Sequence, residues 1–299
     1  MNTIRQMLSI SLLLASFRFA TPLILAALGG IFSEKSGVVN IALEGMMLIG
    51  AFAAVYGSAL TANPWIGVLF SMLAGLIFAA IFAVVCVTFK ADQIVVGTGI
   101  NIFASGVTIF LLQILFGVRG TSPRVMRLPF LRVLGVRFNP ITYIAVILVP
   151  IVWFIFFKTH WGLRIRSIGE HPAAADTLGI NVNLWRFSCI LISGILAGLA
   201  GAHLSIGDGS AFVREMSAGR GFIALAAMIF GKWHPVGAFG AAMLFGYAEA
   251  IAVRVDFVFI PSELISAIPY VLTLVVLAGF IGKSIPPKAV GKPYYKGEK

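Results

Sequence analysis

The sequence predicts an all-α integral membrane protein with roughly 8–10 transmembrane helices of about 20 residues each. Of its 299 residues, 60% are hydrophobic and only 11% are charged, whereas soluble domains carry about 25% charged residues. The mean hydropathy is +1.01. A water-soluble fold of this length could not hide so much apolar surface, so lipid must be the solvent for much of the chain.

The apolar segments that would form these helices follow one another along the chain. They lie near residues 7–31, 38–60, 65–89, 94–116, 140–157, 187–206, 221–231, 236–253 and 263–282. We expect the first to be a retained helix rather than a signal peptide, because no small-residue cleavage site follows it and its apolar pattern continues past Thr21 and Pro22. The segment at 221–231 is too short to span a bilayer.

Polar stretches between the apolar segments indicate the domain organisation. Residues 117–139 contain five arginines and no acidic residue, and residues 164–186 form a second polar stretch. If 158–186 and the Lys-rich tail at 283–299 are cytoplasmic, 12 Lys and Arg residues lie inside and 9 outside, a small bias in the direction of the positive-inside rule. We expect one transmembrane domain over 1–299, with 117–139 as a basic extracytoplasmic loop.

A short internal repeat suggests that the domain has two related halves. "GVVNIALEGM" at 37–46 and "GRGFIALAAM" at 219–228 share Gly, the Ile-Ala-Leu run and Met at matching offsets. From the order of the apolar segments, the two copies would cross the membrane in opposite directions. Interrupted helices at matching places in inverted halves mark the substrate pathway of many transporters.

Four polar residues within apolar segments are candidates for lining such a pathway. Asn40 and Glu44 are four residues apart, which would place them on one face of a helix. Gln93 and Asn101 flank the Gly-rich stretch "VVGTGIN". A carboxylate at membrane depth costs several kcal/mol unless it is paired or hydrated. We therefore predict that Asn40, Glu44, Gln93 and Asn101 line a substrate pathway.

A structural role is the alternative for the same polar residues. Arg18 and Glu249 are also embedded in apolar segments. Arg18 could neutralise Glu44, and Asn40 could cap the start of its helix. Both roles are compatible with the sequence.

The sequence contains no set of residues that predicts an enzyme, a cofactor or a metal site. "GFIGKS" at 279–284 resembles a phosphate-binding loop, but Leu277 stands where its first Gly should be. The four histidines are scattered, without a Cys/His cluster. Cys86 and Cys189 lie in apolar segments, which argues against a disulfide framework. In a membrane protein, the net charge of +11 indicates contact with lipid headgroups rather than nucleic acid.

The stretch from 164 to 186 predicts a short surface helix. Pro172 suits the first position of a helix, and Gly179 suits the left-handed residue just beyond its end. The residues between them, "AAADTL", make about two turns. Such a helix is too short to span lipid but could dock into a groove of another protein. The alternative is an ordinary solvated loop with one helical turn.

The same stretch resembles a known family of proteins. "GEHPAAADTLGINV" is similar to the cytoplasmic coupling segment of ABC importer permeases, in which a pair of small residues precedes a Gly; here these are Ala174, Ala175 and Gly179. "FSEKSGVVNIALEGMMLIGA" and "GFIALAAMIFGKWHPVGA" resemble the two halves of the permeases that serve branched-chain amino acids, ribose-type sugars and nucleosides. The resemblance covers essentially the whole chain and is closest to the shorter permease of bacterial nucleoside importers.

The resemblance implies partners, a location and a role for the coupling segment. It implies a multi-pass permease of the bacterial plasma membrane, with no ATPase site of its own. A separate ABC ATPase subunit would supply energy, a longer paralogous permease would complete a heterodimer, and an extracytoplasmic substrate-binding lipoprotein would deliver substrate. The implied contacts with the ATPase are Glu170, His171, Pro172, Ala174, Ala175, Asp176 and Gly179.

Several functions remain compatible with these residues. The amides of Asn40, Gln93 and Asn101 suit a nucleoside pathway, but they suit a sugar as well. Within the importer class, ribose-type sugars and branched-chain amino acids are the alternative substrates. An ion-coupled secondary transporter with Glu44 or Glu249 as its ion site belongs to a different class, as does a structural membrane subunit that transports nothing.

Overall fold

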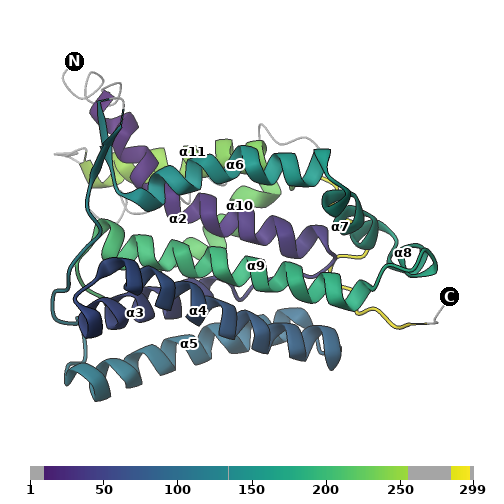
Figure 1. Cartoon of the computed structure of the whole chain (residues 1–299), viewed down its shortest axis with the longest axis horizontal. Helices are drawn as coiled ribbons and strands as arrows, with labels where there is room; N and C mark the ends of the chain where they lie inside the picture. The colour runs from purple at the N-terminus through teal and green to yellow at the C-terminus, as the bar shows by residue number, and fades with distance from the viewer. Residues whose placement is uncertain (1–9, 134, 255–283, 297–299) are drawn as a thin grey trace.

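The computed structural model describes residues 10–133, 135–254 and 284–296, which form a bundle of helices (Figure 1). Seven of the described helices are long and apolar enough to cross a membrane. They are α2 (Ile10–Lys35), α3 (Leu43–Thr61), α4 (Pro64–Ala83), α5 (Gln93–Phe116), α6 (Pro140–Lys158), α9 (Val182–Ala202) and α11 (Pro235–Arg254). The predicted all-α membrane fold is confirmed. The predicted segment at 263–282 lies outside the described residues.

Shorter elements connect and extend the long helices. Two π-helical stretches, η1 (Val84–Thr88) and η2 (His203–Asp208), continue α4 and α9, and the short helices are α7 (His160–Glu170), α8 (Pro172–Thr177) and α10 (Arg220–Phe230). The strands β1 (Leu131–Val133) and β2 (Val136–Phe138) form an antiparallel hairpin, with Leu131 opposite Phe138. At about 1.5 Å per residue, α10 is about 16 Å long, so it is too short to span a bilayer, as predicted.

Polar side chains determine where several of the membrane helices begin. Asp92 accepts hydrogen bonds from the Ile94 and Val95 N–H groups at the start of α5. Asn139 and Asn181 cap α6 and α9 in the same manner. These caps satisfy N–H groups that have no partner within their own helix.

Helix α9 lies at the centre of the bundle, between α2 on one side and α3 and α4 on the other (Figure 1). Glycines allow the backbones to approach closely there. A Cβ atom at Gly75 of α4 would clash with the Gly194 carbonyl oxygen of α9. Small residues at such crossings are typical of membrane helices, which associate through close packing rather than through hydrophobic burial.

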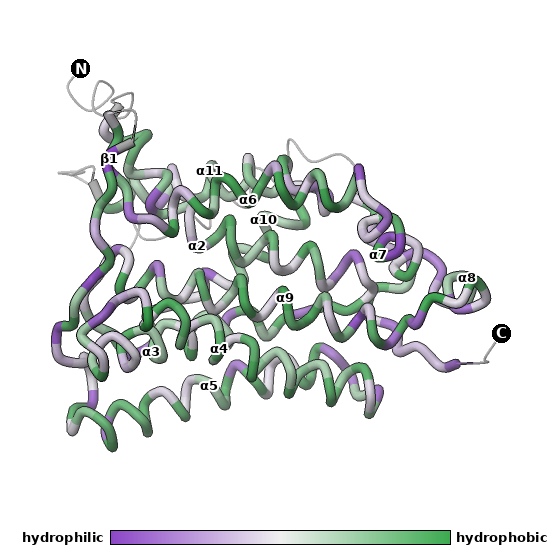
Figure 2. Tube along the Cα trace, in the orientation of Figure 1, coloured by the Kyte–Doolittle hydropathy of each residue, from purple (hydrophilic) through white to green (hydrophobic). Residues whose placement is uncertain are grey.

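The two ends of the bundle differ in what they carry (Figure 1, Figure 2). One end, which we call the α7–α8 end, carries these two short helices and residues 284–296. The opposite end, which we call the loop end, carries residues 117–139 and the hairpin. The long helices between the two ends are mostly apolar along their length (Figure 2), as expected for segments within lipid.

The start of α3 corrects the sequence analysis. An apolar segment was expected from residue 38, but α3 begins at Leu43 and residues 36–42 are not helical. Gly37 adopts a left-handed backbone with φ +96 just after α2, a conformation that glycine adopts without steric cost. Asn40 therefore precedes the helix, and the prediction that it shares a helical face with Glu44 is wrong.

Candidate functional site

The non-helical segment 36–42, which we call the break, is held by side chains from α5. Gln93 Oε1 accepts a hydrogen bond of 2.7 Å from the Val39 N–H. Asn101 donates to the Ile41 carbonyl at 3.0 Å and accepts from the Gly45 N–H at 2.8 Å. Backbone groups outside helices have no water to bond within lipid, so they need partners inside the protein. Gln93 and Asn101 provide those partners.

Asn40 lies in the break and is fully buried. Its amide nitrogen donates to Ser193 Oγ of α9 at 2.9 Å. Among the described residues its carbonyl oxygen Oδ1 has no hydrogen-bond partner. The α3 N-cap position is Ala42, without a side-chain hydrogen bond, so the alternative in which Asn40 caps the helix is wrong.

Glu44 joins the first turn of α3 to the start of α10. Its two carboxylate oxygens accept hydrogen bonds from the Gly219 and Gly221 N–H groups at 2.8 and 2.6 Å. These N–H groups lie at a helix N-terminus, where the helix dipole favours a negative charge. A Cβ atom at Gly221 would lie 2.6 Å from Glu44 Cα, so a glycine is needed for this approach.

The two copies of the repeat therefore meet at their starts. From this point α3 runs to the loop end, where Ser58 donates to the Met126 carbonyl. Helix α10 runs the other way, to a turn in which Trp233 donates to Glu34 near the end of α2. The predicted inverted character of the repeat is confirmed. All four predicted pathway residues, Asn40, Glu44, Gln93 and Asn101, lie at or beside this meeting point.

The alternative in which Arg18 neutralises Glu44 is wrong. Arg18 forms an ion pair with Asp208, at the end of η2. Glu249 of α11 pairs with Arg220, the first residue of α10. The sequence analysis identified Arg18 and Glu249 as embedded charges but did not identify their partners.

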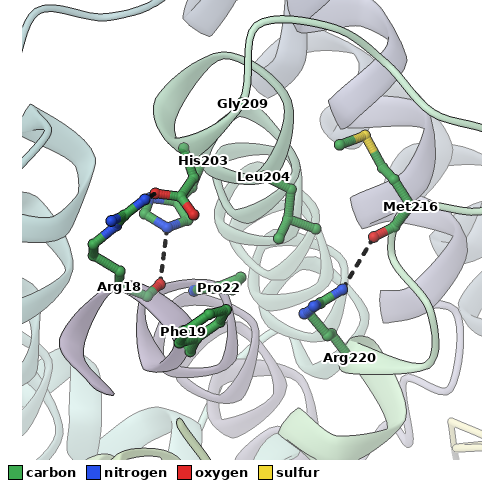
Figure 3. Close-up of a pocket in the computed structure, with 9 residues that line it drawn as sticks. Arg18, Phe19, Pro22, His203, Leu204, Gly209, Met216 and Arg220 are labelled. Carbon is green, nitrogen blue, oxygen red and sulfur yellow. Dashed lines mark hydrogen bonds and ion pairs between the residues drawn. The ribbon is translucent and has the colours of Figure 1, made fainter. Parts of the chain in front are cut away.

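A cavity of about 270 Å³ lies beside these ion pairs (Figure 3). It is lined by Arg18, Phe19, Pro22, His203, Leu204, Asp208, Gly209, Met216 and Arg220. Arg18 and Arg220 lie on either side of the space, while Phe19 and Pro22 of α2 form part of its wall (Figure 3). The Arg18 and Asp208 side chains are 36% and 27% exposed, so the pair is reachable from the cavity. Ionisable groups in membrane segments almost always face such a cavity rather than lipid.

Hydrogen bonds determine the protonation of His203, which is buried at the base of the cavity. Asn139 Oδ1 accepts from the Thr142 N–H, so the Asn139 amide nitrogen faces His203 Nδ1, at 3.2 Å. His203 Nδ1 must then be the acceptor. Nε2 carries the proton and donates to the Arg18 carbonyl at 3.0 Å. The imidazole is therefore held neutral.

Residues 209–219, which contribute Gly209 and Met216 to the cavity lining, are bonded to the basic loop. The Ser122 N–H donates to the Phe212 carbonyl at 2.9 Å, and the Val125 N–H donates to the Ser210 carbonyl at 2.7 Å. The Arg214 N–H donates to the Gly120 carbonyl at 2.9 Å. The loop at 117–139 is thus attached by its backbone to the segment that closes the cavity.

The predicted short helix between Pro172 and Gly179 is present as α8. Pro172 is its first residue, and Gly179 adopts φ +80 just beyond its end. Glu170, His171 and Ala174 are exposed, whereas Asp176 is half-buried. Ala175 is 2% exposed and lies in a small apolar cluster with Ile168, Val182 and Tyr294. The outer surface of α8 is therefore small and polar, and Ala175 holds it to the rest of the protein.

The sequence does not reveal a connection between the α7–α8 pair and the break, which residues 284–296 make. The Ala289 N–H donates to the Gly169 carbonyl of α7 at 2.9 Å, and the Gly291 N–H donates to the Gly37 carbonyl of the break at 3.3 Å. Tyr294 packs with Ala175 of α8. Burial and the neighbouring Asp176 raise the pKa of Tyr294. We call residues 284–296 the tail strap.

Arg186 is the side chain that joins the tail strap to the break. It is 2% exposed. It donates to the Ser36 carbonyl at 3.1 Å and to the Lys292 carbonyl at 3.0 Å. An arginine in the first turns of an otherwise apolar helix was the available signal, but the sequence placed Arg186 only as a flanking charge.

The described residues contain no group of three or more His, Cys, Asp or Glu side chains that could hold a metal ion. Their polar groups instead bridge two interrupted, inverted helices within a multi-pass bundle. This arrangement is that of a membrane transport protein.

Comparison with known proteins identifies the family. Residues 12–277 match the family described as branched-chain amino acid transport system / permease component, and the chain belongs to it. It is therefore a multi-pass permease component of the plasma membrane. The chain is 45% identical to the guanosine ABC transporter permease protein NupQ of Bacillus subtilis, over 95% of this chain and 96% of NupQ. It is 42% identical to the nucleoside ABC transporter permease protein NupC of Lactococcus lactis, over 94% of this chain and 95% of NupC.

A solved structure supports the fold. The chain resembles a metal-chelate type ABC transporter in an inward-facing conformation, with a TM-score of 0.51 and 17% identity, over 89% of this chain and 84% of that one. At this identity the likeness concerns the fold alone.

Proposed function

We propose that this chain is the permease subunit of an ATP-driven importer that takes up nucleosides. The observation that carries the substrate class is its similarity, over about 95% of its length, to permeases named for guanosine and for nucleosides. The amides around the break agree with a polar, uncharged substrate. The relatives named for glucose and for branched-chain amino acids are less similar to the chain, at 35% and 28% identity.

The substrate pathway runs past the meeting point of α3 and α10. Asn40, Glu44, Gln93 and Asn101 hold this point together in the described conformation. A shift of α10 relative to α3 would break the bonds from Glu44 to Gly219 and Gly221, and would open the backbone of the break to a passing substrate. The four residues thus close the pathway in one state and line it in another.

The ATPase subunit drives the permease through its contact with α8. An ABC ATPase subunit binds the exposed side of this helix, through Glu170, His171, Pro172, Ala174, Asp176 and Gly179, while Ala175 anchors the helix from below. The tail strap packs against α8 through Tyr294 and Ala175, and its hydrogen bonds connect it to α7 and to the break. A displacement of α8 by the ATPase is therefore transmitted to residues 36–42 through this packing contact and the hydrogen bonds of the tail strap. ATP hydrolysis takes place in the partner.

Two further partners complete the importer. A longer, paralogous permease packs beside this chain as a heterodimer, and a substrate-binding lipoprotein docks at the loop end. The exposed arginines of residues 117–139 support the second contact, because an exposed basic surface attracts an acidic partner. In this arrangement the α7–α8 end faces the cytoplasm and the loop end faces outward.

Co-purification from membranes tests the coupling role of α8. Ala174→Glu and Leu178→Glu should abolish recovery of the ATPase with this chain, because both positions are exposed on or beside α8. Ala62→Glu, at an exposed position in the α3–α4 connection, is the matched control and should leave recovery unchanged. Equal recovery with all variants would refute the coupling role.

Uptake assays test the energy source. Uptake of labelled guanosine into cells should continue when a protonophore removes the ion gradient and ATP is maintained. It should stop when ATP is depleted and the gradient is kept. The reverse pattern would favour an ion-coupled transporter with Glu44 or Glu249 as its ion site.

A further inference from the structure

The cavity in Figure 3 lies at the loop-end side of α10, and none of its residues belongs to the break. We propose that this cavity is the first binding site for the nucleoside after it leaves the external binding protein. This inference rests on the function proposed above and adds a site and its recognition chemistry.

The charges around the cavity are balanced. Arg18 pairs with Asp208, and Arg220 pairs with Glu249 behind the wall. His203 is held neutral by Asn139 and the Arg18 carbonyl. An ionic ligand would have to separate one of these pairs, which is costly away from bulk water. The site therefore selects an uncharged ligand.

The Arg18–Asp208 pair still has groups that can bond a ligand. Asp208 uses Oδ1 for Arg18, and no described residue bonds its Oδ2. Arg18 uses Nε and Nη2, and its Nη1 has no partner among the described side chains and backbone groups. An acceptor and a donor thus lie side by side at the cavity. They match a pair of neighbouring hydroxyl groups or an amide edge, both of which a nucleoside has.

The rest of the wall suits a flat ring. Phe19, Pro22, Leu204 and Met216 provide an apolar lining beside the polar groups. Small-molecule sites are typically lined mainly by apolar side chains, with a few polar groups that set orientation. A nucleoside would use both the apolar and the polar part of the wall if its base packed against the apolar side chains and its sugar bonded Asp208.

The cavity lies next to the residues that close the pathway. Arg220 lines the cavity, and the N–H groups on either side of it, from Gly219 and Gly221, hold Glu44. A ligand that contacts Arg220 is therefore one residue away from the contact that closes the pathway. On the opposite side, residues 209–219 connect the cavity lining to the basic loop at the loop end. The cavity lies between the docking face and the closed point.

Protection of an introduced cysteine tests occupancy directly. In the purified complete importer, Met216→Cys should react with a water-soluble methanethiosulfonate reagent, while Cys86 and Cys189 are buried and should not. Guanosine at about ten times its Kd should slow the labelling about tenfold, because the free fraction falls by that factor. Guanosine 5′-monophosphate, which is charged, should protect much less. Met126→Cys, on the exposed basic loop, is the control and should be labelled equally with and without guanosine.

Each outcome of the labelling experiment supports or overturns a stated part of the proposal. No labelling of Met216→Cys, or labelling that guanosine does not slow, overturns the site. Equal protection by the nucleoside and its monophosphate overturns the selection for an uncharged ligand. If the wild-type complex imports guanosine without protection, the cavity proposal fails and the proposed function stands. If guanosine protects but the complex imports none, the proposed function fails instead.

Filling the cavity provides a second test. Met216→Trp should reduce guanosine uptake at least tenfold or so while ATPase recovery stays normal, since a bulky ring would occupy a space that accepts about one ligand. Met126→Trp is the matched control. Normal uptake by Met216→Trp would show that substrate does not pass through the cavity.

Discussion

The break and the cavity are both polar, but their polar groups find partners within the membrane protein in different ways. At the break, amide side chains bond backbone groups, and the one carboxylate, Glu44, bonds two N–H groups. At the cavity, charges bond charges, and part of the Arg18–Asp208 pair is exposed. The first arrangement buries its polar groups, including Asn40 Oδ1, which has no partner among the described residues, whereas the second retains free polar groups at the cavity.

This difference in hydrogen bonding indicates that the break and the cavity have different roles. A region in which nearly every polar group has a protein partner opens only when the helices that supply those partners move. A region with balanced charge and free groups can bind a polar ligand without such a movement. The break therefore acts as a gate, and the cavity acts as a receiving site.

We expect the largest effect on stability and uptake from substitution of Glu44, because its carboxylate bonds the start of α10 at the gate. Glu44→Ala should destabilise the protein by about 3 kcal/mol or more, since hydrogen bonds to a charged group contribute about 1.5–3 kcal/mol each. Glu44→Gln keeps the shape but directs an amide N–H₂ toward one of the two N–H donors, so guanosine uptake should fall at least about tenfold, a change of about 1.4 kcal/mol. Normal uptake by assembled Glu44→Gln protein would contradict the gate.

Asn101 tests the gate without a charge. Asn101→Leu should leave the Ile41 carbonyl and the Gly45 N–H without their side-chain partner, at a cost of about 2 kcal/mol that thermal unfolding of the purified protein can detect. Asn183→Leu, at an exposed position in the first turn of α9, is the control. Equal unfolding temperatures for the two variants would show that the break is not held by side chains.

The Arg18–Asp208 pair should have a smaller effect on stability, because it is partly exposed. Arg18→Gln and Asp208→Asn should each lower stability by about 1 kcal/mol, and the double variant should lose less than the sum, since the two changes remove one shared interaction. A double-mutant cycle on thermal stability measures this coupling. Strictly additive losses would indicate that the pair contributes nothing.

His234 should give the smallest effect and lies outside both regions. It precedes α11, and its ring lies tilted against that of Phe157, with the ring centroids 5.0 Å apart. Burial, and then repulsion from Lys35, lower the pKa of His234. The folded protein therefore favours the neutral form, so stability should be full above about pH 6.5, the unfolded value, and should fall slightly as the pH drops through the folded pKa. The slope should disappear in His234→Gln, and a persistent slope would assign it to another group.

The sequence by itself determined the elements whose causes are local. Apolar length gave the membrane helices and showed that the segment at 221–231 is too short to span. Start and stop residues placed α8 between Pro172 and Gly179, because helix ends depend on the few residues around them. The repeat indicated two related segments that run in opposite directions, and Asn40, Glu44, Gln93 and Asn101 were recognisable as polar residues in or beside apolar segments.

Only the tertiary structure decided which polar groups are partners. Arg18 and Asp208 are 190 positions apart, and Arg186 and Ser36 are 150 apart. Every membrane segment is similarly apolar, so hydropathy does not specify which helices are neighbours or which faces they share. The start of α3 depended on partners from α5, and these relieve a non-helical backbone that would otherwise be too costly in lipid. Pairings of this kind arise from the packing of Gly- and Ala-rich helices. This packing brings together residues that are far apart in the sequence, so no local sequence pattern predicts it.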